Sequence, residues 1–199
     1  MNAIGEPAPG SGTTLVHSIS SERNKNPGSA TQTHRLTGLA PVVSHNTRLL
    51  VLGSFPGVAS LAAQQYYGHP QNQFWPILRA IFASSHCPTY ISSYEIRSKW
   101  LLEQGLGLWD VYASCERAGS LDSAIRHAQV NDFASLARRC PNLVAIAHNG
   151  GESFKHAKHS AALGLDVYKL PSSSPANASW SFERKLAAWR EVMAAAGLV

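Results

Sequence analysis

Residues 49–53 read LLVLG, an unbroken apolar run, and residues 54–57 read SFPG directly after it. A short run that is apolar at every position predicts a strand buried on both faces, as in a parallel sheet covered by helices. Pro56 and Gly57 end this strand, because proline lacks a backbone N–H for the ladder and glycine tolerates tight turns. The strand and its turn predict an α/β protein.

Three further segments have the character of buried strands, and stretches with helical spacing of apolar residues alternate with them. The expected later strands are residues 106–111, 143–148 and 166–170, and the expected helices are residues 72–82, 120–128, 132–139, 152–163 and 182–193. Asn131 or Asp132 would cap the third helix. The alternation predicts a three-layer αβα sandwich with a central, mainly parallel four-stranded sheet.

Residues 1–33 differ in composition from the rest of the chain. Nineteen of these 33 residues are Ser, Thr, Gly, Pro or Asn, and they show no apolar periodicity. Such a segment cannot bury enough apolar surface to order itself. We expect a disordered N-terminal extension over residues 1–33 and one folded domain over residues 34–199.

Charge and composition exclude several classes of protein. The net charge of +5 is compatible with a polyanionic partner but too small to establish one. The apolar runs are far shorter than the roughly 20 residues that span a bilayer, so no membrane span is expected. The three cysteines are widely separated, which excludes a zinc ribbon or a secreted disulfide framework and indicates a reducing, cytoplasmic compartment. His156 and His159 are expected to be a solvated pair, so we expect no metal.

In open parallel sheets, ligands bind beyond the carboxyl ends of the strands. That rule selects four segments of the chain, residues 54–57, 110–117, 148–151 and 171–177. The first of them is neither a phosphate-binding loop nor a nucleophile elbow, because it lacks G-K-[ST] and G-x-S-x-G. Aromatic, amide and imidazole side chains follow it closely, namely Tyr66, Tyr67, His69, Asn72, Phe74 and Trp75. This combination suits a flat heterocycle that is stacked on a ring and hydrogen-bonded at its edges.

Residues 53–75 resemble the first motif of the uracil-DNA glycosylase superfamily. The mismatch-specific branch has roughly G-x-N-P-G, a spacer that ends in an aromatic residue, and then H-P-x-N-x-F-W; this chain has GSFPG and, from residue 67, YGHPQNQFW. The resemblance extends through residues 107–125 and 170–178, and it covers about residues 37–189. It is closest to the hypoxanthine (deoxyinosine) DNA glycosylase branch.

The resemblance implies a monofunctional base-excision-repair DNA glycosylase that hydrolyses the N-glycosidic bond of deaminated bases, preferably hypoxanthine. It implies base flipping, no cofactor and no metal. The partner would be double-stranded DNA that contains a deaminated base, and the enzyme would be a monomer in the cytoplasm, associated with the nucleoid. Alternatives within the fold are a uracil, thymine-mismatch or xanthine glycosylase and a non-catalytic lesion-binding relative. A small-molecule nucleoside hydrolase is a further alternative.

The chain departs from the superfamily at one motif position. Most members carry a catalytic Asn or Asp where this chain has Phe55, and phenylalanine cannot orient water. The resemblance therefore implies that the Asn72 carbonyl places the water, by positioning and electrostatics rather than as a strong base. The alternative is that Asn72 only caps the helix that begins near Gln73.

Base and DNA contacts follow from the same motifs. Base-binding candidates are Tyr67 by stacking, His69, Asp110 as acceptor for N1–H of hypoxanthine, and the backbone amides of Ser54 and Phe55. Tyr67 could instead belong to the core and Asp110 could be a turn cap, while His148 and Asn149 are rival edge readers. DNA-binding candidates are Gly53, Pro56, Gly57, Arg117, Ser172, Ser173, Ser174, Pro175 and Asn177. Further cations for a phosphate-binding face are Arg126, Arg138, Arg139, Lys155 and Lys158.

Overall fold

The computed structural model describes residues 35–83, 87–89 and 91–199. They belong to one of the two units into which the chain divides, Thr33–Val199. The extension expected over residues 1–33 lies outside the described residues. Within the described part of the chain, no helix is long and apolar enough to cross a membrane.

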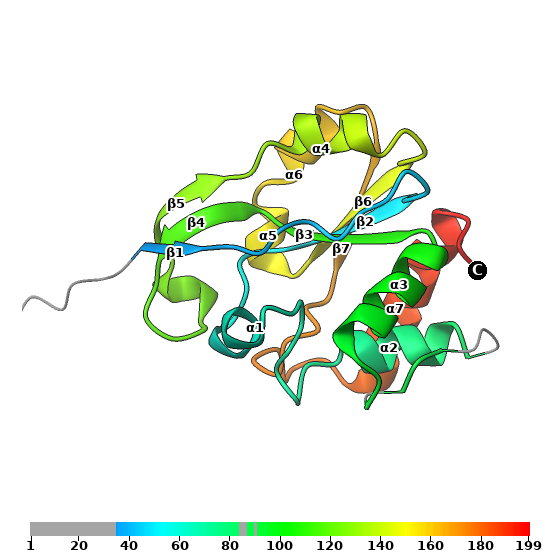
Figure 1. Cartoon of the computed structure of the whole chain (residues 1–199), viewed down its shortest axis with the longest axis horizontal. Helices are drawn as coiled ribbons and strands as arrows, with labels where there is room; N and C mark the ends of the chain where they lie inside the picture. Colours follow the sequence, from blue (N-terminus) through cyan, green and yellow to red (C-terminus); the bar gives the residue numbers. More distant parts are fainter. Residues whose placement is uncertain (1–34, 84–86, 90) are drawn as a thin grey trace, which may run out of the picture. The chain divides into compact units, whose positions relative to one another are not determined.

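A four-stranded parallel sheet lies at the centre of the folded unit (Figure 1), with strand order β3-β2-β6-β7. The strands are β2 (Leu49–Gly53), β3 (Leu106–Asp110), β6 (Ala145–Asn149) and β7 (Asp166–Leu170). Every residue of β2 and β6 is buried, as expected for strands covered on both faces. The predicted parallel sheet is confirmed.

Alternate residues of β2 point into two separate cores. Leu49 and Val51 pack with α2 (Phe74–Ile81), α3 (Tyr94–Glu103) and α7 (Phe182–Ala195), which lie together in Figure 1. Leu50 and Leu52 pack with Phe133 of α4 (Phe133–Arg139) on the opposite face. The period of two along a strand therefore builds the three layers. Asp132 accepts a hydrogen bond from Ser135 N at 2.9 Å, which confirms the predicted cap of α4.

The prediction of a helix over residues 120–128 is wrong. This segment forms a short 3-10 helix, η1 (Asp122–Ala124), and then strand β5 (Arg126–Val130). Ile125 and Ala128 both pack toward the core although they are three residues apart, because the strand is bulged and His127 has a positive φ of 49°. A bulge thus imitates helical spacing in the sequence.

Strand β5 belongs to a second, antiparallel sheet of order β1-β4-β5, with β1 (Arg35–Thr37) and β4 (Tyr112–Glu116). The sequence patterns did not predict this sheet, α1 (Val58–Ala63) or α3. The single helix expected over residues 152–163 is divided into α5 (Gly151–Phe154) and α6 (Ala157–Ala161).

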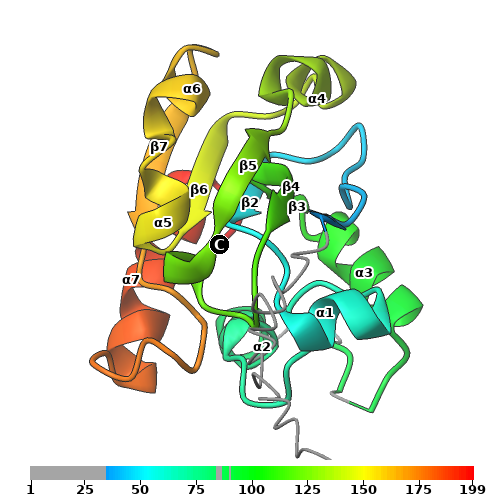
Figure 2. The ribbon, with the colours of Figure 1, turned by 90° about the vertical axis from the view of Figure 1, so that its left-hand side faces the viewer.

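The parallel register brings the ends of all four strands to one edge of the sheet. Gly53 pairs with Asp110, and Asn149 pairs with Leu170, in each case at the last residue of the strands. In Figure 2, α1 and α2 lie beyond this edge. The loops that follow these strands therefore meet there, as the rule for open parallel sheets requires.

Candidate active site

A cavity of about 970 Å³ opens at the carboxyl ends of the four parallel strands. The cavity is lined by every candidate for catalysis and base binding and by every first-choice candidate for DNA binding except Arg117, whereas the rival reader His148 and the further cations Arg126, Arg138, Arg139, Lys155 and Lys158 do not line it. The candidates that line it are Gly53, Ser54, Phe55, Pro56, Gly57, Tyr67, His69, Asn72, Asp110, Ser172, Ser173, Ser174, Pro175 and Asn177. The fold thus brings together segments that are more than 100 residues apart in the chain.

Asp110 ends strand β3 inside this cavity, and its side chain is almost completely buried. Its Oδ2 has no hydrogen-bond partner among the described residues. Burial, together with the nearby charge of Asp122, raises the pKa of Asp110 to about 8, although Arg117 opposes the shift. Asp110 is therefore largely a neutral carboxylic acid at pH 7, with one donor and one acceptor to offer. Gly53 leaves room for this carboxyl group, because a Cβ at position 53 would meet Oδ1 of Asp110 and displace it.

Tyr67, like Asp110, has a raised pKa and a buried polar atom without a hydrogen bond in the described part of the chain. Its hydroxyl is buried without a hydrogen bond to a described residue, and burial raises its pKa, although the nearby Asn149 amide opposes that shift. Its backbone has a positive φ of 55°, which is uncommon for a side chain of this size. One face of its ring stacks on Phe74, with the ring centroids 4.0 Å apart and the planes at 20°. Tyr67 therefore packs in the core through its ring, as the alternative interpretation expected, but its hydroxyl forms no hydrogen bond with a described residue.

Asn72 lies at the entrance to helix α2. Its Oδ1 accepts a hydrogen bond from the backbone N–H of Phe74 at 3.0 Å, while the side chain of Gln73 caps nothing. Asn72 therefore caps the start of α2, as the alternative interpretation expected. The contact also fixes the orientation of the amide, and a carbonyl oxygen keeps a second lone pair for another donor.

Residues 172–177, the serine loop, form one wall of the cavity and are fastened at several points. Ser173 O accepts from Gln73 N at 2.9 Å, which joins the loop to the start of α2. The buried ammonium group of Lys185 in α7 donates to Gln73 Oε1 at 2.8 Å and to Asn177 O at 3.0 Å. The backbone N–H groups of Ser173, Ser174 and Asn177 are bonded within the protein, so the loop can offer phosphates chiefly the hydroxyl groups of Ser172 and Ser174. Ser173 is fully buried, so its expected contact with DNA is corrected to support of the loop.

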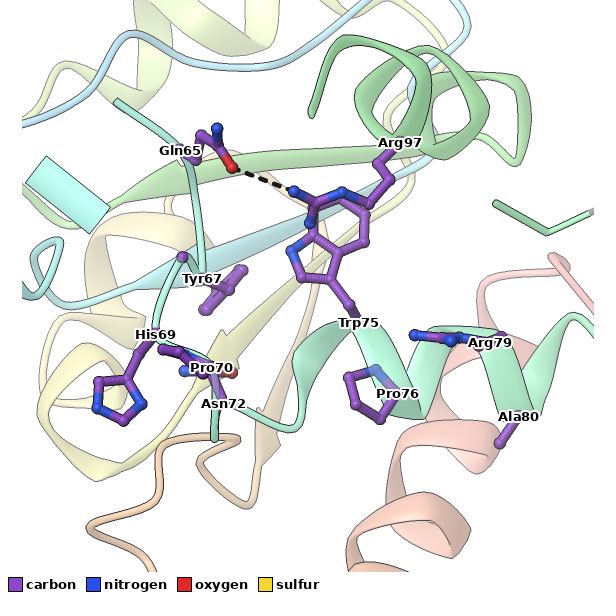
Figure 3. A pocket seen from close by; sticks show the side chains of 11 residues that line it. Gln65, Tyr67, His69, Pro70, Asn72, Trp75, Pro76, Arg79, Ala80 and Arg97 are labelled. Atoms are coloured by element: carbon purple, nitrogen blue, oxygen red, sulfur yellow. Dashed lines mark hydrogen bonds between the residues drawn. The ribbon is translucent and has the colours of Figure 1, made fainter. Parts of the chain in front are cut away.

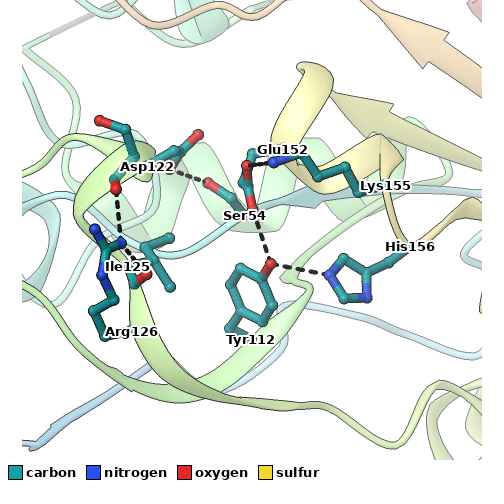
Figure 4. A network of polar contacts seen from close by, with 9 residues as sticks. Ser54, Tyr112, Asp122, Ile125, Arg126, Glu152, Lys155 and His156 are labelled. Carbon is teal, nitrogen blue, oxygen red and sulfur yellow. Dashed lines mark hydrogen bonds and ion pairs between the residues drawn. The ribbon is translucent and has the colours of Figure 1, made fainter.

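A second wall, which the sequence did not indicate as part of the site, comes from the segment around η1. Ser54 Oγ donates to Asp122 Oδ1 at 2.6 Å (Figure 4), and Val58 N donates to Ser120 Oγ at 2.9 Å. Leu121, between these two anchors, lines the cavity with 61% of its surface exposed. The signal available in the sequence was the position of Leu121 inside the second matching motif, residues 107–125.

Neighbouring polar contacts support this wall. Arg126 Nη1 donates to the carbonyl oxygens of Ser123 and Ile125 at 2.8 and 2.7 Å, which closes the segment on itself. Figure 4 shows Tyr112 beside it, between Glu152 and His156. The Tyr112 hydroxyl lies 3.0 Å from Glu152 Oε1 and 2.9 Å from His156 Nε2. These contacts connect strand β4 to α5 and the turn that follows it.

Arg117 does not lie where the sequence suggested. Its guanidinium group is buried, donates to the carbonyl oxygen of Pro56, and lies over the Phe55 ring at 5.0 Å from the centroid. No DNA phosphate can reach a side chain buried in this way, so its expected role in DNA binding is corrected to support of the first loop. Phe55 itself is buried in the second core.

His148 and Asn149, the rival candidates for reading the edge of the base, lie in different environments. His148 is fully buried, and its two ring nitrogens lie 2.8 Å from Ser153 Oγ and 2.9 Å from Ser160 Oγ. Burial lowers its pKa to about 4, so His148 is a neutral core residue rather than an edge reader. Asn149 lines the cavity, but its amide is bonded to Ser173. Among the described residues, no group of three or more His, Cys, Asp or Glu side chains could hold a metal ion.

Comparison with known proteins agrees with this geometry. The family model described as the uracil DNA glycosylase superfamily matches residues 40–193. The chain belongs to the uracil-DNA glycosylase superfamily. It is therefore a DNA glycosylase, and the resemblance drawn from the three motifs is confirmed.

The matches between this glycosylase and its individual relatives cover almost the whole length of each relative. A protein of Methanosarcina barkeri named hypoxanthine DNA glycosylase is 36% identical over 154 residues, 77% of this chain and 95% of the relative. Its namesake from Methanosarcina acetivorans is 36% identical over 148 residues, 74% of this chain and 92% of the relative. A solution NMR structure of a protein from M. acetivorans, described as a "putative Uracil DNA glycosylase", superposes with a TM-score of 0.72 at 34% identity, covering 82% of this chain and 99% of that one.

Proposed function

We propose that this DNA glycosylase removes hypoxanthine from deoxyinosine in double-stranded DNA, after the damaged nucleotide has flipped into the 970 Å³ cavity. The observation that carries the proposal is the pair of buried groups without partners, Asp110 Oδ2 and the Tyr67 hydroxyl. Buried polar groups are nearly always paired, so two that line one cavity indicate a ligand with polar edges. The names of the two Methanosarcina relatives support the same substrate.

Asp110 suits the edge of hypoxanthine that carries N1–H and the C6 carbonyl. A neutral carboxylic acid accepts from N1–H through its carbonyl oxygen and donates its O–H to the C6 oxygen. The raised pKa of Asp110 keeps that acid form at neutral pH. Tyr67 contributes a ring for stacking and a hydroxyl for a second edge of the base. His69 lies at the same rim.

Hydrolysis requires a water molecule at C1′ of the flipped nucleotide and a stabilised leaving base. The bond between C1′ and the base nitrogen breaks with its electron pair going to the base, the water oxygen bonds to C1′, and the base takes up one proton. We assign the placing of that water to Asn72, whose Oδ1 keeps one lone pair beside the bond from Phe74 N. The backbone amides of Ser54 and Phe55 adjoin the developing negative charge.

The remaining contacts hold the DNA backbone. The serine loop, with Pro175 at its tip, supplies the hydroxyl groups of Ser172 and Ser174, and the first loop, from Gly53 to Gly57, supplies backbone N–H groups. Leu121 is apolar and exposed at the rim, which suits a side chain that fills the gap left by a flipped base.

We propose a monofunctional enzyme, because a lyase step needs a free amine beside the sugar. Lys169 lines the cavity, but its ammonium group lies over the Phe154 ring at 5.5 Å from the centroid. The reaction uses water and fixed dipoles, so we propose no cofactor and no metal. The proposal places the activity in residues 34–199, acting as a monomer on chromosomal DNA in the cytoplasm.

Single-turnover cleavage of labelled duplexes tests this function. Matched duplexes contain one deoxyinosine, deoxyuridine, deoxyxanthosine or thymine mismatch, and abasic products are revealed with and without alkali. We expect cleavage of the deoxyinosine duplex, dependent on alkali and faster than that of the others. Preferred cleavage of uracil or xanthine would replace the substrate but keep the chemistry. Tight binding of lesion duplexes without abasic product would replace the enzyme by a lesion-binding relative.

A further inference from the structure

A second cavity of about 800 Å³ adjoins the proposed active site. Three residues line both cavities, namely Tyr67, His69 and Asn72. Figure 3 shows these three on one side of the second cavity and Arg97, Trp75 and Arg79 on the other. Asn72 therefore stands between the second cavity and the serine loop, which lines only the first.

The second cavity is positively charged. Arg79 of α2 and Arg97 of α3 line it, and its described lining includes no Asp or Glu. Neither arginine forms an ion pair with a described residue, and the Nε of each is buried without a hydrogen-bond partner in that part of the chain. Burial lowers the pKa of Arg97, and repulsion by the Arg79 charge adds to this shift, although Tyr94 opposes it. Two neighbouring cations without a counter-charge favour an anionic ligand.

The rest of the lining limits the shape of that ligand. The Arg97 guanidinium lies over the Trp75 ring at 4.7 Å from the centroid and donates to Gln65 Oε1 at 3.1 Å, so its plane is fixed. Pro70 and Pro76 add apolar surface. A cavity that offers a positive charge flanked by apolar surface suits a nucleotide, whose phosphate would face the charge and whose sugar would face the apolar surface. A guanidinium with free N–H groups is well suited to phosphate oxygens.

We propose that the second cavity binds one backbone phosphodiester of the DNA strand that carries the flipped nucleotide. A flipped nucleotide is joined to its strand by a phosphodiester on each side of its sugar. With the sugar at Asn72, the serine loop holds the strand on one side, and Arg79 with Arg97 holds it on the other. The inference rests on the proposed function only in taking flipped DNA as the ligand, and it adds a specific phosphate-binding site.

Binding of a duplex that contains a stable abasic analogue tests the site without requiring excision. Arg79→Ala is compared with Arg79→Lys and with a matched control, Arg48→Ala, at an exposed arginine that directly precedes β2, at the edge of the sheet opposite the cavity. We expect Arg79→Ala to raise Kd about tenfold and to reduce the slope of log Kd against log salt by about 0.9, the value for one lost phosphate contact. Arg79→Lys should recover part of the affinity, and Arg48→Ala should stay within about twofold of wild type.

Neutral methylphosphonates, placed one at a time on either side of the abasic analogue, identify the phosphate. We expect one position at which the methylphosphonate weakens wild-type binding about tenfold but changes binding of Arg79→Ala by less than about twofold. The proposal is overturned if no position shows this coupling, or if Arg79→Ala binds like wild type at every salt concentration while melting normally. Failure of deoxyinosine excision, by contrast, would leave these binding results unchanged and would contradict only the proposed function.

Discussion

Asn149 and Ser173 hold each other through two hydrogen bonds. Asn149 Nδ2 donates to Ser173 Oγ, and Ser173 N donates to Asn149 Oδ1, both at 2.9 Å. Both residues are buried, so the carboxyl end of strand β6 and the serine loop are joined away from solvent. The Asn149 amide therefore adds two buried bonds to the contacts that hold this wall of the cavity.

Replacing that amide should loosen the serine loop. Asn149→Ala removes both bonds and leaves the buried Ser173 N–H unpaired, which costs about 1–3 kcal/mol of folding free energy. Ser173→Ala removes only the hydroxyl bond and should cost less. We expect graded losses in melting temperature and in duplex affinity, measured by thermal unfolding and fluorescence anisotropy. Equal effects of the two variants on affinity would contradict the role of the backbone bond.

The Asn72 series separates capping from catalysis. Asn72→Ala should lower the single-turnover excision rate about 10²-fold, the scale of losing one preorganised polar group. It should also lower stability by about 1 kcal/mol, because Phe74 N loses its acceptor. Asn72→Ser keeps a capping oxygen and should recover stability without recovering the rate. A wild-type rate in Asn72→Ala would show that another group places the water.

The raised pKa of Asp110 predicts an alkaline limit to activity. The neutral acid is lost as pH rises through about 8, so excision should fall about tenfold per pH unit above that value. Asp110→Asn keeps a donor and an acceptor, so it should retain activity at pH 7 within about tenfold and lack this alkaline fall. Asp110→Ala should lose about 10²-fold. An inactive Asp110→Asn combined with a wild-type rate that rises with pH would indicate that the ionised form is required.

The same pKa predicts a change in stability. Asp110 titrates at about 8 in the folded protein, against an ordinary value of 3.8. The folded state therefore holds a proton that the unfolded chain releases between these values. The stabilisation linked to that proton is fully present below about pH 4 and is lost as pH rises through about 8. Asp110→Asn should accordingly raise the melting temperature more at pH 9 than at pH 5.

Leu121 tests the proposed flipping step. Leu121→Ala should slow excision from duplex DNA about tenfold, because the gap left by the base is no longer filled, and unstacking a base costs a few kcal/mol. Excision from a single-stranded oligonucleotide should be unchanged. Val144→Ala is the matched control, since Val144 is also exposed, at 42%, and lies just before β6, at the edge of the sheet opposite the cavity. Equal slowing on both substrates would assign Leu121 to folding instead.

Phe55 occupies the motif position where the superfamily usually has its water-placing residue. Its ring is buried beneath the Arg117 guanidinium, so Phe55→Asn should destabilise the protein by about 3 kcal/mol, the range for losing a buried aromatic ring. We expect no gain of uracil excision, while Phe55→Leu should be mild. A gain of uracil cleavage in Phe55→Asn would show that position 55 reaches the sugar.

Local patterns were enough to predict the elements whose burial is uniform. The apolar run at residues 49–53 and the segments that became β3 and β6 were predicted because strands covered on both faces need apolar residues at nearly every position. The edge strand β7 was also predicted, although most of its residues are exposed or half-buried. The bulged strand β5 and the half-exposed helix α3 were missed, since irregular or weakly patterned segments depend on the surfaces they pack against.

By itself, the sequence determined the α/β class, the edge of the sheet where the site lies, and the family, because these depend on periodicity and on motifs at strand ends. Only the tertiary structure decided which polar groups there are buried. It enclosed Arg117, left Asp110 Oδ2 without a partner and brought Arg79 beside Arg97. The physical reason is that burial, pKa and charge compensation are set by side chains from distant segments, whose approach no local pattern records.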